Sequence, residues 1–251
     1  MLPKIDVPIY ELQLPLTRKN IRFRPFLVKE EKILLMAMEA NDADSVIVAV
    51  KQILNNCCLD DINIDELPIT DIEFMFLNLR ARSVSEIVEL PYRCNNKIDG
   101  MPDETGVPTT QRECGNIVNL EVNLLDIHPE THEKKIDRIE FSETMGLLIK
   151  YPSFKMVEQA QKQEGSEVDK LMNILIACIE GVYTEETIFY SKDVPEKELI
   201  DFVENLTREQ FNKIQEFFDT MPKIKKEVDF NCAKCGYHEK ITIEGLQSFF
   251  V

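Results

Sequence analysis

The chain has 251 residues, of which 44% are hydrophobic and 29% charged, a balance typical of a globular protein that can bury a sizeable core. Its formal net charge of −16 would repel a phosphate backbone, which disfavours nucleic-acid binding and indicates either solubility or a basic protein partner. No secretory signal opens the chain and no apolar run is long enough to span a bilayer, so we expect a cytosolic product without membrane contact. The cytosol keeps thiols reduced, so the seven cysteines indicate metal binding or burial rather than disulfides.

The N-terminal third combines a predicted hairpin with predicted helices. Residues 10–26 alternate apolar and polar side chains on both sides of a polar turn, a pattern typical of a β-hairpin. Apolar residues then recur at three- and four-residue steps, and Thr70 with Glu73 has the spacing of a capping box at a helix start. The predicted helices of this part are 29–40, 44–56 and 70–82.

The rest of the chain returns to strand patterns before a second helical part. Residues 84–93 and 117–127 alternate like strands on either side of a long loop that contains glycine and proline, and residues 137–141 resemble a shorter strand. In the second helical part, Gly181 is expected to end the first helix, and Thr207 with Gln210 gives another capping-box spacing. The predicted helices of this part are 168–181, 195–206 and 207–221.

Together these patterns predict an α+β protein in which a small zinc-ribbon-like β subdomain joins a central strand pair to the C-terminal hairpin. A second alternating pattern beyond the last helix predicts that hairpin, with a cysteine pair at its turn. The predicted segments are an N-terminal β-hairpin (1–27), a helical segment (28–83), a β segment with a long loop (84–150), a second helical segment (151–222) and a zinc-knuckle hairpin (223–251) packing on 84–127.

The cysteine pattern predicts a structural metal site. Cys232 and Cys235, followed by Gly236, have the spacing of a zinc knuckle, in which a tight turn aims two thiolates at one metal. A tetrahedral site needs two more ligands, and Cys94 and Cys114 lie at corresponding ends of the two central strand-like segments. We therefore expect these four cysteines to bind a structural Zn²⁺.

Other interpretations of the cysteines stay open. The pair could be a surface turn with two free thiols, whereas a redox pair is disfavoured because strand-like sequence follows Gly236 where thioredoxin-type chemistry needs a helix. His238 could replace one cysteine ligand. The other cysteines are expected to be buried as small apolar side chains: Cys57, Cys58 and Cys178.

No catalytic motif is present in the sequence. A phosphate-cradling glycine loop, a G-x-S-x-G elbow and an H-E-x-x-H pair are all missing. His128 and His132 bracket a proline in a polar segment, which favours a solvated loop over a metal site. We therefore expect no catalytic or cofactor-binding residues, no small-molecule substrate and no enzymatic activity.

Two apolar stretches remain. Residues 211–218 carry a phenylalanine-rich stripe at helical spacing, which is expected to join the core. The terminal residues 245–251 (GLQSFFV) must either pack back on the protein or enter a partner.

Four stretches together resemble one known family: RPFLVKEEKILLMAME (24–39), IEFMFLNLRARSVSE (72–86), FFDTMPKIKKEVDFNCAKCGY (217–237) and the closing EGLQSFF. They are similar to the baseplate hub proteins of T4-like contractile-tailed bacteriophages, over residues 22–250. The resemblance implies a hub subunit or hub assembly factor that contacts other baseplate hub and tail proteins. It would act in the host cytoplasm during assembly, or in the tail baseplate of the virion, and Cys232 with Cys235 would match the family's C-terminal cysteine pair.

Two alternatives come from other functional classes. A zinc-ribbon regulator that binds nucleic acid would use the local basic residues of the C-terminal segment, which are Lys223, Lys225, Lys226, Lys234 and Lys240. A hydrolase would require a deep pocket with converging titratable groups.

Overall fold

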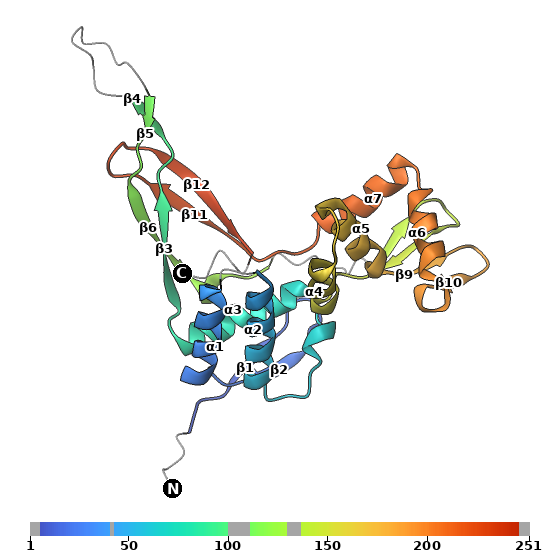
Figure 1. Cartoon of the computed structure of the whole chain (residues 1–251), viewed down its shortest axis with the longest axis horizontal. Helices are drawn as coiled ribbons and strands as arrows, with labels where there is room; N and C mark the ends of the chain where they lie inside the picture. Colours follow the sequence, from blue (N-terminus) through green and yellow to red (C-terminus); the bar gives the residue numbers. More distant parts are fainter. Residues whose placement is uncertain (1–5, 41–42, 100–110, 130–136, 246–251) are drawn as a thin grey trace. The chain divides into compact units, whose positions relative to one another are not determined.

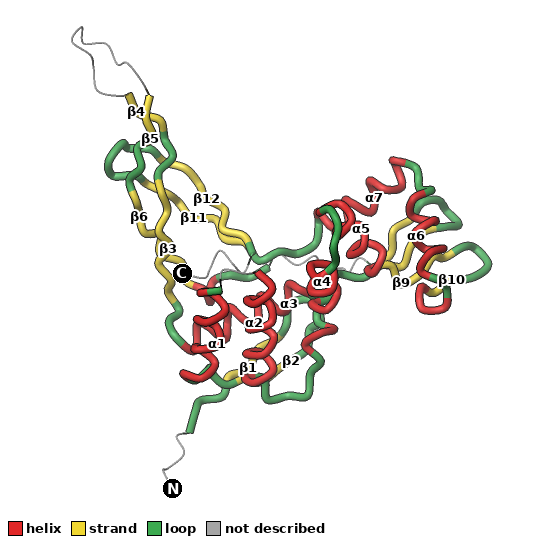
Figure 2. Tube along the Cα trace, in the orientation of Figure 1, coloured by secondary structure: helices red, strands yellow, loops and turns green. Residues whose placement is uncertain are grey.

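The computed structural model describes residues 6–40, 43–99, 111–129 and 137–245. Within these ranges the chain forms helices and several small antiparallel sheets (Figures 1 and 2), which confirms the α+β prediction. The chain divides into two compact units: unit 1 contains residues 1–76 and 130–222, and unit 2 contains residues 77–129 and 223–251. None of the described helices has the length and apolar character needed to cross a membrane.

Unit 1 begins with the predicted hairpin, which is confirmed. Strands β1 (Tyr10–Gln13) and β2 (Asn20–Phe23) pair antiparallel, with Tyr10 opposite Phe23. Alternation in β2 buries Ile21 and Phe23, as expected for a strand with one face on a core. The helices that follow are α1 (Val28–Glu39), α2 (Ala43–Cys57) and α3 (Ile69–Ser83), with the short 3₁₀ turn η1 (Ile64–Glu66) before α3. Residues 77–83, at the end of α3, belong to unit 2.

The capping box predicted at Thr70 is wrong, because α3 already begins at Ile69. The Thr70 hydroxyl lies inside the first turn and donates a hydrogen bond to the Pro222 carbonyl at 2.7 Å. Asp71 is fully buried and accepts hydrogen bonds from the backbone amides of Leu16 and Thr17 at 2.8 and 3.0 Å. The start of α3 is therefore held by contacts distant in sequence, which local spacing cannot reveal.

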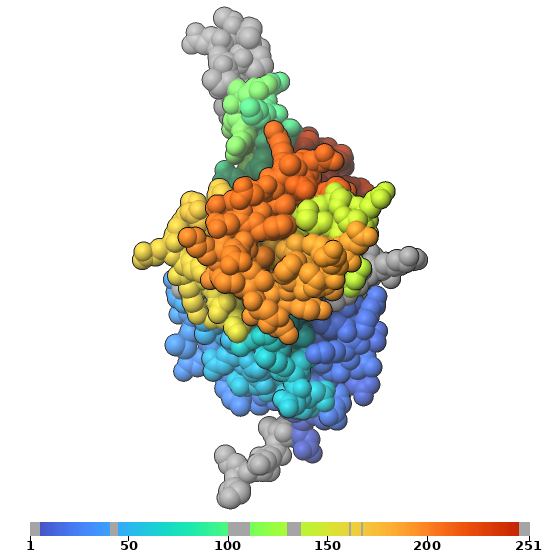
Figure 3. All heavy atoms as spheres, turned by 90° about the vertical axis from the view of Figure 1, so that its right-hand side faces the viewer, coloured from blue at the N-terminus to red at the C-terminus, as the bar shows by residue number. Residues whose placement is uncertain are grey.

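The second part of unit 1 contains a four-stranded antiparallel sheet in the order β10-β9-β8-β7. Helices accompany this sheet, and the orange atoms of α6 and α7 cover much of the face turned to the viewer in Figure 3. The strands are β7 (Arg138–Glu140), β8 (Gly146–Ile149), β9 (Ile179–Tyr183) and β10 (Ile188–Tyr190). The helices are α4 (Phe154–Lys162), α5 (Glu167–Cys178), α6 (Glu196–Glu204) and α7 (Arg208–Asp219), with the 3₁₀ turn η3 (Ser191–Asp193) after β10.

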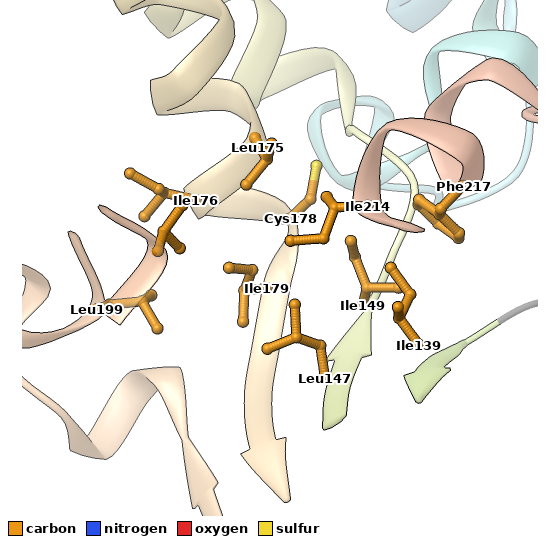
Figure 4. Close-up of a cluster of buried hydrophobic side chains, with 11 residues drawn as sticks. Ile139, Leu147, Ile149, Leu175, Ile176, Cys178, Ile179, Leu199, Ile214 and Phe217 are labelled. Carbon is orange, nitrogen blue, oxygen red and sulfur yellow. The ribbon is translucent and has the colours of Figure 1, made fainter. Parts of the chain in front are cut away.

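A buried apolar cluster joins these strands and helices (Figure 4). Ile214 and Phe217 of α7 are buried in it, with Phe211 and Phe218 packed against it, so the phenylalanine-rich stripe is confirmed as core. The capping box at Thr207 is also confirmed, because its hydroxyl accepts from the Gln210 amide at 3.3 Å and its own amide donates to the Gln210 side chain at 2.9 Å.

Gly181 does not end a helix, contrary to the sequence-based expectation. Helix α5 ends at Cys178 and Gly181 lies within β9, so residues 151–222 contain two strands in addition to helices. A Cβ at position 181 would lie 2.8 Å from the Phe189 carbonyl oxygen of β10. The glycine is therefore needed for the close approach of a neighbouring strand.

Unit 2 is built from three antiparallel strand pairs: β3 with β6, β4 with β5, and β11 with β12. Tyr92 of β3 meets Phe230 of β11 edge to face, with ring centroids 5.1 Å apart, and Phe230 is fully buried. The strands are β3 (Ile87–Arg93), β4 (Lys97–Asp99), β5 (Gln111–Glu113), β6 (Ile117–Asn123), β11 (Lys225–Asn231) and β12 (His238–Glu244), with the 3₁₀ turn η2 (Leu124–Asp126) after β6.

Candidate metal centre

The structure brings four cysteines of unit 2 together. Cys94 directly follows β3, Cys114 lies between β5 and β6, and Cys232 and Cys235 lie in the turn between β11 and β12. Their sulfur atoms all lie within 4.8 Å of one another. We call these four residues the cysteine cluster. It contains all four cysteines that the sequence pattern selected.

The sulfur positions fit one tetrahedral metal ion. The Sγ atoms of Cys94 and Cys235 are 3.7 Å apart, as are those of Cys114 and Cys232. A tetrahedron with metal–sulfur bonds of about 2.3 Å has edges of about 3.8 Å. A disulfide would need about 2.05 Å, and all four thiols are free. The cysteine cluster can therefore hold a metal ion.

The two central cysteines are positioned by a reciprocal pair of backbone hydrogen bonds. The Cys94 amide donates to the Asn116 carbonyl, and the Cys114 amide donates to the Asn96 carbonyl, both at 2.8 Å. Gly115 adopts a φ of +65°, a left-handed conformation that glycine tolerates best, and its amide donates to the Cys94 carbonyl. These bonds fix both thiols at the junction between the β3–β6 and β4–β5 pairs.

Two asparagine side chains contact the cysteine cluster. The Asn96 side-chain amide donates to the Cys235 sulfur, and that of Asn116 donates to the Cys232 sulfur, both at 3.6 Å. Amide donors around a metal-bound thiolate orient it and stabilise its charge. Neither residue was predicted as part of the site, although the C-x-N spacing is repeated at Cys94 and Cys114.

The C-terminal pair has the geometry of a tight knuckle. The Cys232 amide donates to the Tyr237 carbonyl at 2.9 Å, and the Gly236 amide donates to the Cys232 carbonyl at 2.8 Å. Gly236 has a φ of +72° and open space around it. Glycine is therefore required at position 236 for its backbone conformation, as in other turns that need a left-handed residue.

The four thiols differ in acidity. Burial raises the pKa of Cys94 to about 12. Burial also acts to raise the pKa of Cys232, but the amides of Cys235 and Lys234 outweigh it and lower that pKa to about 6. The side-chain amide of Asn96 lowers the pKa of Cys235. Amide donors on the knuckle side therefore stabilise thiolates, the form that binds a cation.

The remaining cysteines and the histidines that the structure describes lie outside the cysteine cluster. His238 is not in the cysteine cluster, and its Nδ1 contacts the Asn231 side chain. Cys57 and Cys178 are buried as predicted and Cys58 is half-buried; burial raises the pKa of Cys57 to about 11. His132 and the terminal residues 246–251 lie outside the described part of the chain.

Several lysines of the C-terminal segment are occupied by contacts within unit 2. Lys223 pairs with Glu244 at 3.2 Å and Lys240 with Glu227 at 3.7 Å. The Lys234 ammonium donates to the Cys114 carbonyl at 3.2 Å. These contacts reduce the positive charge that the segment offers to a phosphate backbone.

One cavity in unit 1, of about 450 Å³, is lined partly by titratable groups, including Glu11, Arg22 and Asp60. Arg22 and Asp60 pair with each other at 2.7 Å. This pairing occupies both groups, so the cavity gives no support to the hydrolase alternative.

Comparisons with known proteins give one match. Residues 7–251 match the family described as T4 bacteriophage base plate protein. Neither the curated proteins nor the solved structures include a significant match to the chain.

Proposed function

Because the chain belongs to the T4 bacteriophage base plate protein family, we propose that it is a non-enzymatic component of the baseplate hub of a contractile phage tail. It acts as a hub subunit or hub assembly factor through contacts with other hub and tail proteins. The family match, which covers residues 7–251, is the observation that carries this proposal. The net charge of −16 suits contacts with basic neighbouring subunits.

We further propose that the cysteine cluster holds a structural Zn²⁺. Four thiolates in a tetrahedral arrangement are typical of structural zinc or of iron–sulfur centres. Zinc is favoured because the sulfur spacing fits a single ion and three of the four cysteines are buried, as in closed structural sites. The ion would stabilise the fold and would take part in no reaction.

Such a site would hold together segments of unit 2 that are distant in the sequence. Cys94 and Cys235 are separated by 141 positions, and Cys114 and Cys232 by 118. A bound ion would fix the β11–β12 hairpin against the central strands of unit 2, so that this β structure meets neighbouring subunits in one orientation. Loss of the ion would loosen unit 2 without abolishing any chemical step.

Deletion and virion analysis test the hub proposal. We expect phage that lack the protein to accumulate incomplete baseplates, and a plasmid copy to restore them. Mass spectrometry of purified virions and of assembly intermediates distinguishes the two roles: a hub subunit is found in both, and an assembly factor only in the intermediates. Normal tails in the deletion phage would overturn the proposal.

Nucleic-acid binding by a zinc ribbon remains the competing function. A gel-shift assay at low salt, where phosphate contacts are strongest, measures it directly. A salt-dependent shift of DNA would favour this alternative. The pairing of Lys223 and Lys240 with glutamates leads us to expect no shift.

A further inference from the structure

Arg80, in the last turns of α3, is a half-buried cation without an ion pair among the described residues. Its Nη1 atom is buried and has no hydrogen-bond partner among the described residues. Other arginines are paired: Arg22 with Asp60 at 2.7 Å, Arg24 with Glu30 at 3.1 Å and Arg82 with Glu86 at 2.6 Å. The buried Nη1 atom of Arg80 therefore needs an explanation.

A cavity of about 210 Å³ opens beside this side chain, within unit 2. Its wall comes from the end of α3 and the start of β3, which are consecutive in the chain (Figure 1). The lining residues are Arg80, Val84, Ser85, Ile87, Val88 and Glu89. The cavity therefore combines the Arg80 guanidinium with three aliphatic side chains, one hydroxyl and the Glu89 carboxylate.

The carboxylates near the cavity are engaged elsewhere. Glu86 forms the ion pair with Arg82. Glu89 accepts a hydrogen bond from the Asn119 side chain across the β3–β6 pair at 3.1 Å. Neither has a hydrogen bond or ion pair with Arg80 among the described residues. The described part of the chain therefore leaves the buried Nη1 atom without a partner.

An unpaired buried cation is costly, because it has lost water without gaining a substitute. Burial lowers the pKa of Arg80, but an arginine stays charged at neutral pH. The group that best relieves this situation is a carboxylate, whose two oxygens match the guanidinium fork. The free chain therefore contains a site that an external carboxylate would complete.

The rim of the cavity indicates which kind of residue would flank that carboxylate in a partner. Val84 and Ile87 are 60% and 52% exposed, so their apolar surface is accessible to a partner. Val84 and Ile87 would pack against an aliphatic residue next to the incoming carboxylate. A nucleic-acid phosphate would bring no such apolar surface.

We propose that the Arg80 cavity is a docking site for an aspartate or glutamate side chain, flanked by aliphatic residues, of a neighbouring baseplate protein. The identity of the neighbour rests on the proposed hub function, whereas the carboxylate specificity of the cavity does not. Charge complementarity and the aliphatic rim select this occupant. The site would act as a specificity contact in assembly, because a wrong partner would leave the guanidinium buried and unpaired.

The carboxylate specificity is tested on the isolated full chain with isovalerate, a branched aliphatic acid small enough for the cavity. NMR titration should give saturable shifts of the Arg80 side chain. Neutral isovaleramide and inorganic phosphate should give none. Arg80→Met should weaken isovalerate binding by about tenfold or more, whereas Arg112→Met, an exposed arginine of the same unit, should leave it unchanged. Equal binding to wild type and Arg80→Met, or a stronger response to phosphate, would overturn the proposal.

A second measurement separates docking from a structural role. Because Arg80 gains no partner within the described chain, Arg80→Met should leave the melting temperature unchanged or raise it, yet reduce rescue of baseplate assembly in the deletion phage. A clear drop in melting temperature would show that Arg80 stabilises the fold, and full rescue would show that docking does not use it. If the deletion phage builds normal tails, the hub function fails while the isovalerate result still stands.

Discussion

The sulfur atoms of Cys94 and Cys235 lie 3.7 Å apart although 141 positions separate the two residues in the chain. Backbone hydrogen bonds position the chain around both cysteines, so the fold itself largely forms the ligand geometry. Such preorganisation lowers the conformational cost of binding an ion.

The purified protein should contain one zinc ion per chain. Cys94→Ser and Cys232→Ser should each lose most of it, because a hydroxyl is a poor replacement for a thiolate ligand. Cys58→Ser is the matched control, since Cys58 is half-buried and lies outside the cysteine cluster. Elemental analysis measures all four proteins. Equal zinc in the wild type and the two cluster variants would contradict the proposed site, and iron with sulfide would indicate a different centre.

The two asparagine donors should tune metal affinity. Asn96→Ala and Asn116→Ala each remove one N–H···S hydrogen bond, at Cys235 and Cys232 respectively. We expect zinc affinity to fall about 10- to 100-fold in each, the range typical of residues that orient metal ligands. Competition with a chromogenic chelator measures the change. Asn119→Ala, which removes an exposed hydrogen bond to Glu89, should leave affinity unaltered.

Asp71 should be a major contributor to the stability of unit 1. Its carboxylate accepts from the Leu16 amide, the Thr17 amide and the Thr17 hydroxyl. Asp71→Ala should lower the free energy of unfolding by about 3 kcal/mol, because buried donors lose a charged acceptor. Urea denaturation measures the loss. The exposed Asp61 provides the control, and an equal effect of Asp61→Ala would show that the contacts of Asp71 are not responsible.

Glu30 should make the fold sensitive to acid. Although burial acts to raise its pKa, hydrogen bonds from Arg24 and from the Leu27 amide outweigh it and hold the pKa below the usual value. A carboxyl whose folded pKa lies below the unfolded value contributes stability above the unfolded pKa, and loses it as pH falls through the folded pKa. Glu30→Gln should therefore cost about 3 kcal/mol at pH 7, because Arg24 loses its buried partner.

The same variant should lose little additional stability on acidification. Urea denaturation at pH 7 and at a pH below about 4 should show the difference between wild type and Glu30→Gln shrinking as the wild-type carboxyl is protonated. Glu39→Gln, at an exposed position of α1, should follow the wild type at both values. If the difference in free energy of unfolding between wild type and Glu30→Gln stayed constant across this pH range, the proposed role of the Glu30 carboxyl would be contradicted.

Local sequence patterns determined much of the secondary structure. The alternation of apolar and polar residues predicted the N-terminal hairpin. Helical spacing and a capping box predicted α7 and its buried stripe. Both signals arise from neighbours within a few residues. The C-x-x-C pair and two strand-end cysteines were enough to select the cysteine cluster. Resemblance of four stretches then indicated the baseplate family, which composition and periodicity alone do not identify.

Only the tertiary structure decided which distant groups meet. Thr70 bonds to Pro222 across 152 positions, Gly181 is required by the approach of Phe189, and Asn96 reaches Cys235 across 139 positions. The unpaired state of Arg80 is likewise invisible in sequence, where it resembles any helical arginine. The physical reason is common to all four: hydrogen bonding and burial depend on which atoms packing brings within a few ångströms, and spacing along the chain does not encode that.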